Sequence, residues 1–135
     1  MRLHNRAMKT CRIVRASTTF RGKQGLDYFA GISAESAGSQ AICMHRLVMP
    51  PGASAKAHYH ERHETAIYML HGAAEFRHGP KLEHCNRVEQ GDYIYIPAGV
   101  PHMPYNPFDT EAIAIVARTD PNEQESVVLL EIENA

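Results

Sequence analysis

The stretch "GASAKAHYHERHETAIYMLHG", residues 52–72, decides how this chain is interpreted. Within it, residues 58–64 carry three imidazoles and two carboxylates. Successive residues of a β-strand point to opposite faces, so the side chains of His58 and His60 project the same way. Two imidazoles on one face can chelate a divalent ion, and Glu64 follows closely enough to add a carboxylate. An HxH pair alone also occurs on exposed strands, so a metal site needs support from the rest of the sequence.

A second stretch, "GDYIYIPAGVPHMPYN", spans residues 91–106. Together the two stretches resemble the two sequence motifs of the cupins. The first motif is represented by Gly52, His58, His60, Glu64 and Gly72, and the second by Gly91, Pro97, Gly99, His102 and Asn106. The resemblance covers residues 41–118 and implies that His102 completes a ligand set of His58, His60 and Glu64.

One departure from the first motif concerns its glutamate. Seven residues separate Glu64 from Gly72, where the motif has six. Counted forward from His60 the glutamate position is Glu64, whereas counted back from Gly72 it is Thr65. A single β-bulge would reconcile the counts, because a bulge re-aims a side chain. We expect Glu64 to be the ligand; the alternatives are His63, if the loop turns inward, and no ligand from this stretch.

Short strand signals recur along the chain, and turn signals separate them every 8 to 12 residues or so, which is typical of an antiparallel sandwich or barrel. We expect strands within residues 41–52, 55–60, 65–72, 73–80, 91–99, 111–118 and 125–132, with a strand-like segment at 11–16 and a loop with one helical turn at 31–39. The resemblance implies an all-β fold, a double-stranded β-helix or jelly-roll barrel. We expect one domain over residues 1–135, with a motif core at about 41–118 and an N-terminal extension at 1–40.

Composition excludes several classes of function. The net charge is −1 with neutral histidines, which argues against electrostatic binding to nucleic acid or to a membrane surface. No apolar run approaches the roughly 20 residues of a membrane span, and the N-terminus has no apolar core of a signal peptide. Three widely spaced cysteines without a CxxC pair indicate free thiols in a reducing compartment. We therefore expect a cytoplasmic protein.

The mixture of imidazole nitrogen and carboxylate oxygen suits one divalent transition metal ion, iron, manganese, nickel or zinc, better than calcium or magnesium. A barrel of this kind holds one small ligand in its interior. We expect a metal-dependent enzyme acting on a small oxygen-bearing molecule, and we slightly favour a dioxygenase. One alternative is an isomerase of sugars or sugar phosphates, for which Arg46, Arg77 and Arg118 are the candidate basic residues. Another is a binding or sensing module without turnover.

No residue can be assigned a catalytic role from the sequence. Tyrosines at four positions are candidates for a proton donor near the site, namely Tyr68, Tyr93, Tyr95 and Tyr105. His45 lies within a predicted strand whose register is unknown, so it can face either the pocket or the outside. An exposed sheet edge or an N-terminal strand lent to a neighbour would favour association, and we expect a homodimer.

Overall fold

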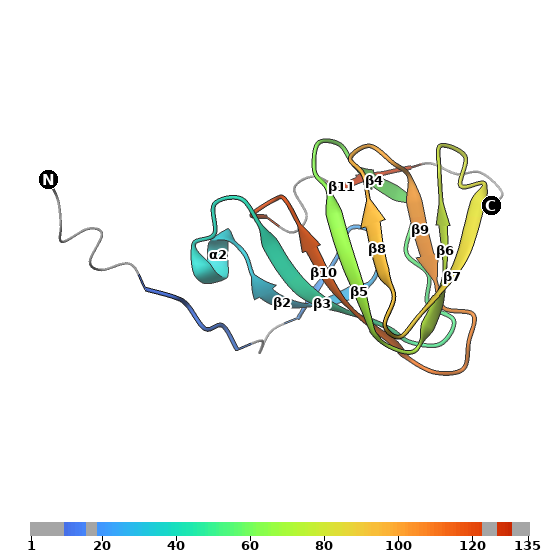
Figure 1. Cartoon of the computed structure of the whole chain (residues 1–135), viewed down its shortest axis with the longest axis horizontal. Coiled ribbons are helices and arrows are strands. Elements are labelled where there is room, and N and C mark those ends of the chain that lie inside the picture. Colours follow the sequence, from blue (N-terminus) through green and yellow to red (C-terminus); the bar gives the residue numbers. More distant parts are fainter. Residues whose placement is uncertain (1–9, 16–18, 123–126, 131–135) are drawn as a thin grey trace, which may run out of the picture.

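The structure is a computed structural model that describes residues 10–15, 19–122 and 127–130. Two antiparallel sheets face each other and form the walls of one barrel (Figure 1). The strands are β1 (Thr19–Arg21), β2 (Asp27–Ile32), β3 (Cys43–Met49), β4 (His58–His60), β5 (Thr65–His71), β6 (Ala73–His78), β7 (His84–Glu89), β8 (Tyr93–Ile96), β9 (His102–Tyr105), β10 (Ala112–Arg118) and β11 (Val127–Leu129). The predicted all-β barrel, a double-stranded β-helix, is confirmed.

The larger sheet has the order β1-β2-β3-β10-β5-β8, and the smaller sheet has the order β11-β4-β9-β6-β7. Strand β10 lies in the middle of the larger sheet, between β3 and β5. Its sequence, AIAIVAR, alternates between buried and half-buried residues. Ala112, Ala114, Val116 and Arg118 are the buried set, so all four share the face that lines the barrel.

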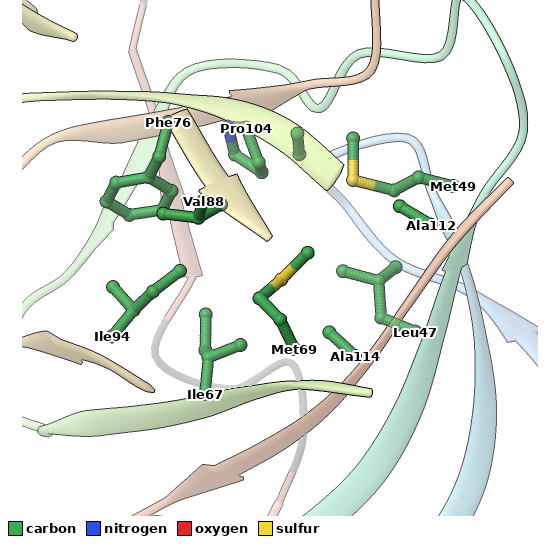
Figure 2. Close-up of a pocket in the computed structure, with 11 residues that line it drawn as sticks. Leu47, Met49, Ile67, Met69, Phe76, Val88, Ile94, Pro104, Ala112 and Ala114 are labelled. Atoms are coloured by element: carbon green, nitrogen blue, oxygen red, sulfur yellow. The ribbon is translucent and has the colours of Figure 1, made fainter. Parts of the chain in front are cut away.

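The barrel interior has an apolar part, shown in Figure 2. Side chains from both sheets converge there and leave a cavity of about 30 Å³. The lining residues are Leu47, Met49, Ile67, Met69, Ala74, Phe76, Val88, Ile94, Pro104, Ala112 and Ala114. This volume is about that of one water molecule in the liquid, so this part of the barrel is a packed core.

The remainder of the interior is polar. Buried polar side chains gather where β3, β4, β5, β9 and β10 carry the residues His45, His58, His60, Thr65, His102 and Arg118. Such groups are tolerated in an interior only when they are hydrogen-bonded, paired or available to a ligand. The interior is therefore divided into a closed apolar part and a polar part whose side chains could bind a ligand.

All seven predicted strands are present, although the last, β11, is described for Val127–Leu129 only. The predicted helical turn is also present, as α2 (Ala34–Ala37), and Ser33 caps it. The prediction of a strand at 11–16 is wrong for residues 11–15, which lie outside both sheets; residue 16 lies outside the described residues. Strands β1 and β2 belong to the extension before the motif core and complete the larger sheet beside β3.

Two strands of the smaller sheet, β7 and β9, were not predicted. Strand β7 is almost entirely exposed, with only Val88 buried, so it lacks the apolar alternation that marks a strand. Strand β9 contains Pro104, a residue that cannot donate to a ladder and normally argues against a central strand.

Among the described residues there is no helix with the length and apolarity that crossing a membrane requires.

Candidate metal centre

Three histidines converge in the polar part of the barrel. His58 and His60 lie on the same face of β4, and the single register pair between β4 and β9 places His58 opposite His102. All three side chains are buried, and one ligand nitrogen from each lies within 4.8 Å of the other two. One ion can bridge this separation after small side-chain adjustments. The two sequence motifs also meet through their backbones, because Gly99 N–H donates to the carbonyl oxygen of His60 at 2.7 Å.

Backbone carbonyls orient two of the rings. The Nδ1 atom of His58 lies 2.7 Å from the carbonyl oxygen of Lys56, and Nδ1 of His102 lies 3.0 Å from that of Val100. A carbonyl oxygen only accepts, so each Nδ1 carries the proton and donates it. The lone pair of each ring then resides on Nε2. This is the arrangement in which a histidine ligand is held by a second hydrogen bond and presents its other nitrogen to a metal.

The electrostatic surroundings keep the three imidazoles neutral. Burial, reinforced by the charge of Arg118, lowers the pKa of His58 to about 4. Burial and the neighbouring His58 lower the pKa of His102 to about 3, and burial together with Arg118 lowers that of His60 to about 2. Neutral imidazole is the form that binds a metal. The site is therefore available to a cation over the whole neutral pH range.

Glu64 is not brought together with the histidines. Its side chain is exposed on the outside of the barrel, where a carboxylate oxygen accepts a hydrogen bond of 2.6 Å from Tyr95. The next residue, Thr65, is buried and opens β5. The pairing of β5 with β10 does contain a register shift, at Leu70, because Ala114 pairs with Met69 whereas Ile113 pairs with His71. This irregularity lies downstream of Glu64 and does not turn that carboxylate inward.

The other groups near the HxH pair also lie apart from the three histidines. The Nε2 atom of His63 is 3.9 Å from a carboxylate oxygen of the buried Asp120, and the histidine is part-exposed. Glu61 is exposed, as expected. Asn106 from the second motif is fully buried, and its amide nitrogen donates to the carbonyl oxygens of Met49 and Thr110 at 2.9 Å each. That asparagine thus closes a loop.

None of the four candidate tyrosines is buried. Tyr93 and Tyr95 are exposed by 82% and 62%, and Tyr105 is also exposed. Tyr68 is half-buried and packs against Tyr93 with 4.9 Å between ring centroids. The buried tyrosine is Tyr28 of β2, whose ring meets that of His45 edge-on at 4.8 Å. Tyr28 was not among the candidate tyrosines because it lies before the motif core and outside both motifs.

His45 faces the interior, which resolves the question that its strand register left open. It is 3% exposed, and burial with a contribution from Arg118 lowers its pKa to about 3. Of the three arginines considered for an isomerase, Arg118 is buried, whereas Arg46 and Arg77 are exposed. Arg46 stacks on Phe29, with its guanidinium carbon 4.4 Å from the ring centroid.

Comparison with known proteins agrees with this architecture. The family model of the cupin domain matches residues 45–118, more than half of the chain. The polyketide cyclase RemF from Streptomyces resistomycificus superposes with a TM-score of 0.72 at 20% identity, over 93% of this chain and 89% of that one. An uncharacterised protein with a double-stranded β-helix domain from Klebsiella pneumoniae gives a TM-score of 0.66 at 17% identity, with coverages of 88% and 91%.

A third similar structure is oxalate decarboxylase from Bacillus subtilis, described for its Mn(II) centres. Its TM-score is 0.75 at 21% identity, and the match covers 90% of this chain but 33% of the decarboxylase. Comparison of the sequence with curated proteins gave no match. At identities of this order, the three structures establish the fold.

Proposed function

Since this chain belongs to the cupin family, we propose that His58, His60 and His102 bind one divalent transition metal ion and that the loaded protein is an enzyme acting on a small oxygen-bearing molecule. The convergence of three buried, neutral imidazoles carries this proposal. Burying three imidazoles together costs solvation free energy, a cost that apolar core residues would not incur. A bound cation offsets that cost by accepting their lone pairs.

The donor set narrows the choice of metal. Imidazole suits iron, nickel and zinc, whereas manganese prefers a site richer in oxygen. The expected ligand Glu64 is exposed, and Thr65 takes the buried place beside it. We therefore propose a centre of three histidines, without Glu64, and favour iron, nickel or zinc over manganese.

The chain contributes orientation and exclusion of water to the chemistry. Lys56 and Val100 hold the protons of His58 and His102 on Nδ1, so both rings keep one tautomer while a substrate binds. The apolar part of the barrel closes one side of the centre, and Phe76 stacks against His102 there at 5.9 Å. A bound ion would supply Lewis-acid or redox chemistry, and three imidazole ligands would leave room for oxygen donors such as water or a substrate. A dioxygenase remains slightly favoured.

The isomerase alternative retains some support from Arg118. It required basic residues in the pocket, and Arg118 is buried while Arg46 and Arg77 are exposed. A sugar phosphate carries two negative charges near neutral pH, and phosphate sites usually combine several donors. One buried guanidinium therefore gives this function less support than the metal-dependent reaction with a smaller molecule.

Metal analysis of protein purified without a histidine tag tests the centre. After reconstitution with Fe²⁺, Ni²⁺ or Zn²⁺, we expect one equivalent in the wild type and in His71→Ala, which removes an exposed histidine. We expect the equivalent to be lost in His102→Ala. Substoichiometric metal in the reconstituted wild type, or retention in His102→Ala, would contradict the proposal. Oxygen consumption with small acids, diols and catechols then separates an oxygenase from a binding module.

A further inference from the structure

Arg118 places a buried positive charge in the polar part of the barrel. It is the last residue of β10, lies on the inward face of that strand and is 4% exposed. The sheet pairs it with Thr65 on one side and with Cys43 on the other. Since Thr65 follows His60 after one short loop, the arginine and the histidines occupy the same end of the interior.

Thr65 holds the guanidinium in place. The Nε–H group of Arg118 donates to the Oγ1 atom of Thr65 at 3.1 Å, and both side chains are buried. Thr65 is also the residue reached by counting back from Gly72 to the glutamate of the cupin motif. By this count, the position of the motif's glutamate is occupied by the neutral hydroxyl of Thr65, which is hydrogen-bonded to Arg118.

The charge of Arg118 acts on the entire centre. After burial, it contributes to the lowered pKa values of His58, His60 and His102. Its buried position on the inward face of β10, bonded to Thr65, places the guanidinium in the same polar part of the interior as the three rings. Among the described residues, the group of converging ligand atoms contains no carboxylate. The ligands therefore add no negative charge, and Arg118 adds a positive one.

We propose that Arg118 makes this centre selective for small carboxylates, a substrate class that rests on the proposed function. A carboxylate can accept two parallel hydrogen bonds from a guanidinium, and its charge is attracted by the arginine and by a bound divalent ion. The apolar part of the barrel leaves a cavity of about 30 Å³. That packed part has room for about one water molecule, so an acid that binds at the centre would have to be small enough to fit within the polar part.

A matched pair of ligands tests this selectivity. Glycolate and glycolamide have nearly the same shape and differ by one charge. The protein is loaded with Co²⁺, whose absorption spectrum changes when a ligand enters, and the dissociation constant of each compound is measured. The ion alone prefers the anion, so the informative quantity is the ratio of the two constants in each variant.

We expect Arg118→Met to weaken glycolate binding by about 10- to 100-fold, the range for a hydrogen bond to a charged group, and to leave glycolamide nearly unchanged. Arg118→Lys should recover part of the loss because it restores the charge. Arg46→Met is the matched control, since that arginine is exposed and stacks on Phe29. Co²⁺ binding itself should persist in all three variants.

Thr65→Glu provides an independent variant should Arg118→Met fail to fold. The new carboxylate would pair with Arg118 and face the histidines, so we expect tighter Co²⁺ binding and weaker glycolate binding. Equal affinity of the wild type for both compounds, or an unchanged ratio in Arg118→Met, would overturn the proposal. Failure of the wild type to bind Co²⁺ would instead overturn the metal centre itself.

Discussion

Glu64 and Thr65 are consecutive in the sequence and lie on opposite sides of the barrel wall. The carboxylate of Glu64 accepts a hydrogen bond from Tyr95 outside, whereas Oγ1 of Thr65 accepts one from Arg118 inside. The outer bond is exposed to solvent and the inner one is buried. Because Thr65 and not Glu64 faces inward, the proposed metal centre would receive no negative charge from this stretch.

Replacing the outer pair should leave metal binding intact. We expect Glu64→Gln and Tyr95→Phe to change metal affinity by less than about threefold, because an exposed polar contact is worth about 1 kcal/mol or less. His60→Gln, four residues earlier, should abolish binding. Calorimetric titration of the three variants with Zn²⁺ measures this. A loss of more than tenfold in Glu64→Gln would show that the glutamate reaches the ion.

Stability of the metal-free protein should fall in mild acid. The pKa values of His58, His60 and His102 are lowered in the folded state from an ordinary value near 6.5, so the unfolded chain binds more protons between about pH 6.5 and pH 3. The stabilisation is complete above about pH 6.5 and is lost as the pH falls. At pH 5 the three groups together make the free energy of unfolding fall by roughly 4 kcal/mol per pH unit.

Urea unfolding of the chelator-treated protein at pH 7.5, 6 and 5 checks this dependence. His45, whose pKa is also lowered to about 3, adds a fourth such group, so His102→Gln should reduce the measured slope by about one quarter. Saturating metal should raise the curve without changing its slope above about pH 5, because the bound ion stabilises only the folded state and the folded histidines are already neutral there. A free energy of unfolding that stays constant from pH 7.5 to pH 5 would contradict the buried, neutral histidines.

Asn106 should matter for stability and not for metal binding. Its amide nitrogen donates to the carbonyl groups of Met49 and Thr110, and its Oδ1 atom accepts from the Phe108 N–H group at 3.0 Å. We expect Asn106→Ala to cost about 2–4 kcal/mol, because backbone groups of the loop lose their partners. Asn86→Ala is the control, an exposed asparagine that bonds to His78, with a cost of about 1 kcal/mol or less. Thermal unfolding gives both values, and a smaller loss for Asn106 would refute its structural role.

Gly72 and Gly91 form a second matched pair. Both have positive φ angles, of 75° and 95°. A Cβ atom at Gly91 would meet open space, whereas one at Gly72 would collide with the carbonyl oxygen of Glu111. We expect Gly91→Ala to cost about 1 kcal/mol through backbone strain alone, and Gly72→Ala to cost about 3 kcal/mol or more. Equal losses in denaturant unfolding would mean that β5 and β10 separate easily at this end.

The convergence of the three histidines could be predicted because it follows from their spacing in the sequence. Alternation along a strand places His58 and His60 on one face, and the second motif supplies His102 at a fixed distance from its glycines. The sequence did not predict the side of Glu64, because that residue precedes β5 and its direction depends on where the chain enters the strand. Two counts that differ by one residue give opposite faces.

From the sequence, Arg118 was only one of three arginines considered for the pocket. The strand that ends at Arg118 is apolar on both faces, so its sequence does not reveal which side lines the barrel. Tyr28 and His45 come from β2 and β3, whose register relative to the centre depends on pairing across the sheet. Strand β9 escaped prediction because Pro104 normally breaks a ladder. The homodimer stays a prediction.

Strand β4, which carries two of the three histidines, is held between β9 and β11. Val127 pairs with His60 and Leu129 with His58, so a segment made much later than the histidines supports them. The strand that carries His58 and His60 thus gains its second neighbour only after β11 has paired with it. An ion bound at the proposed centre would therefore report that this distant pairing has formed.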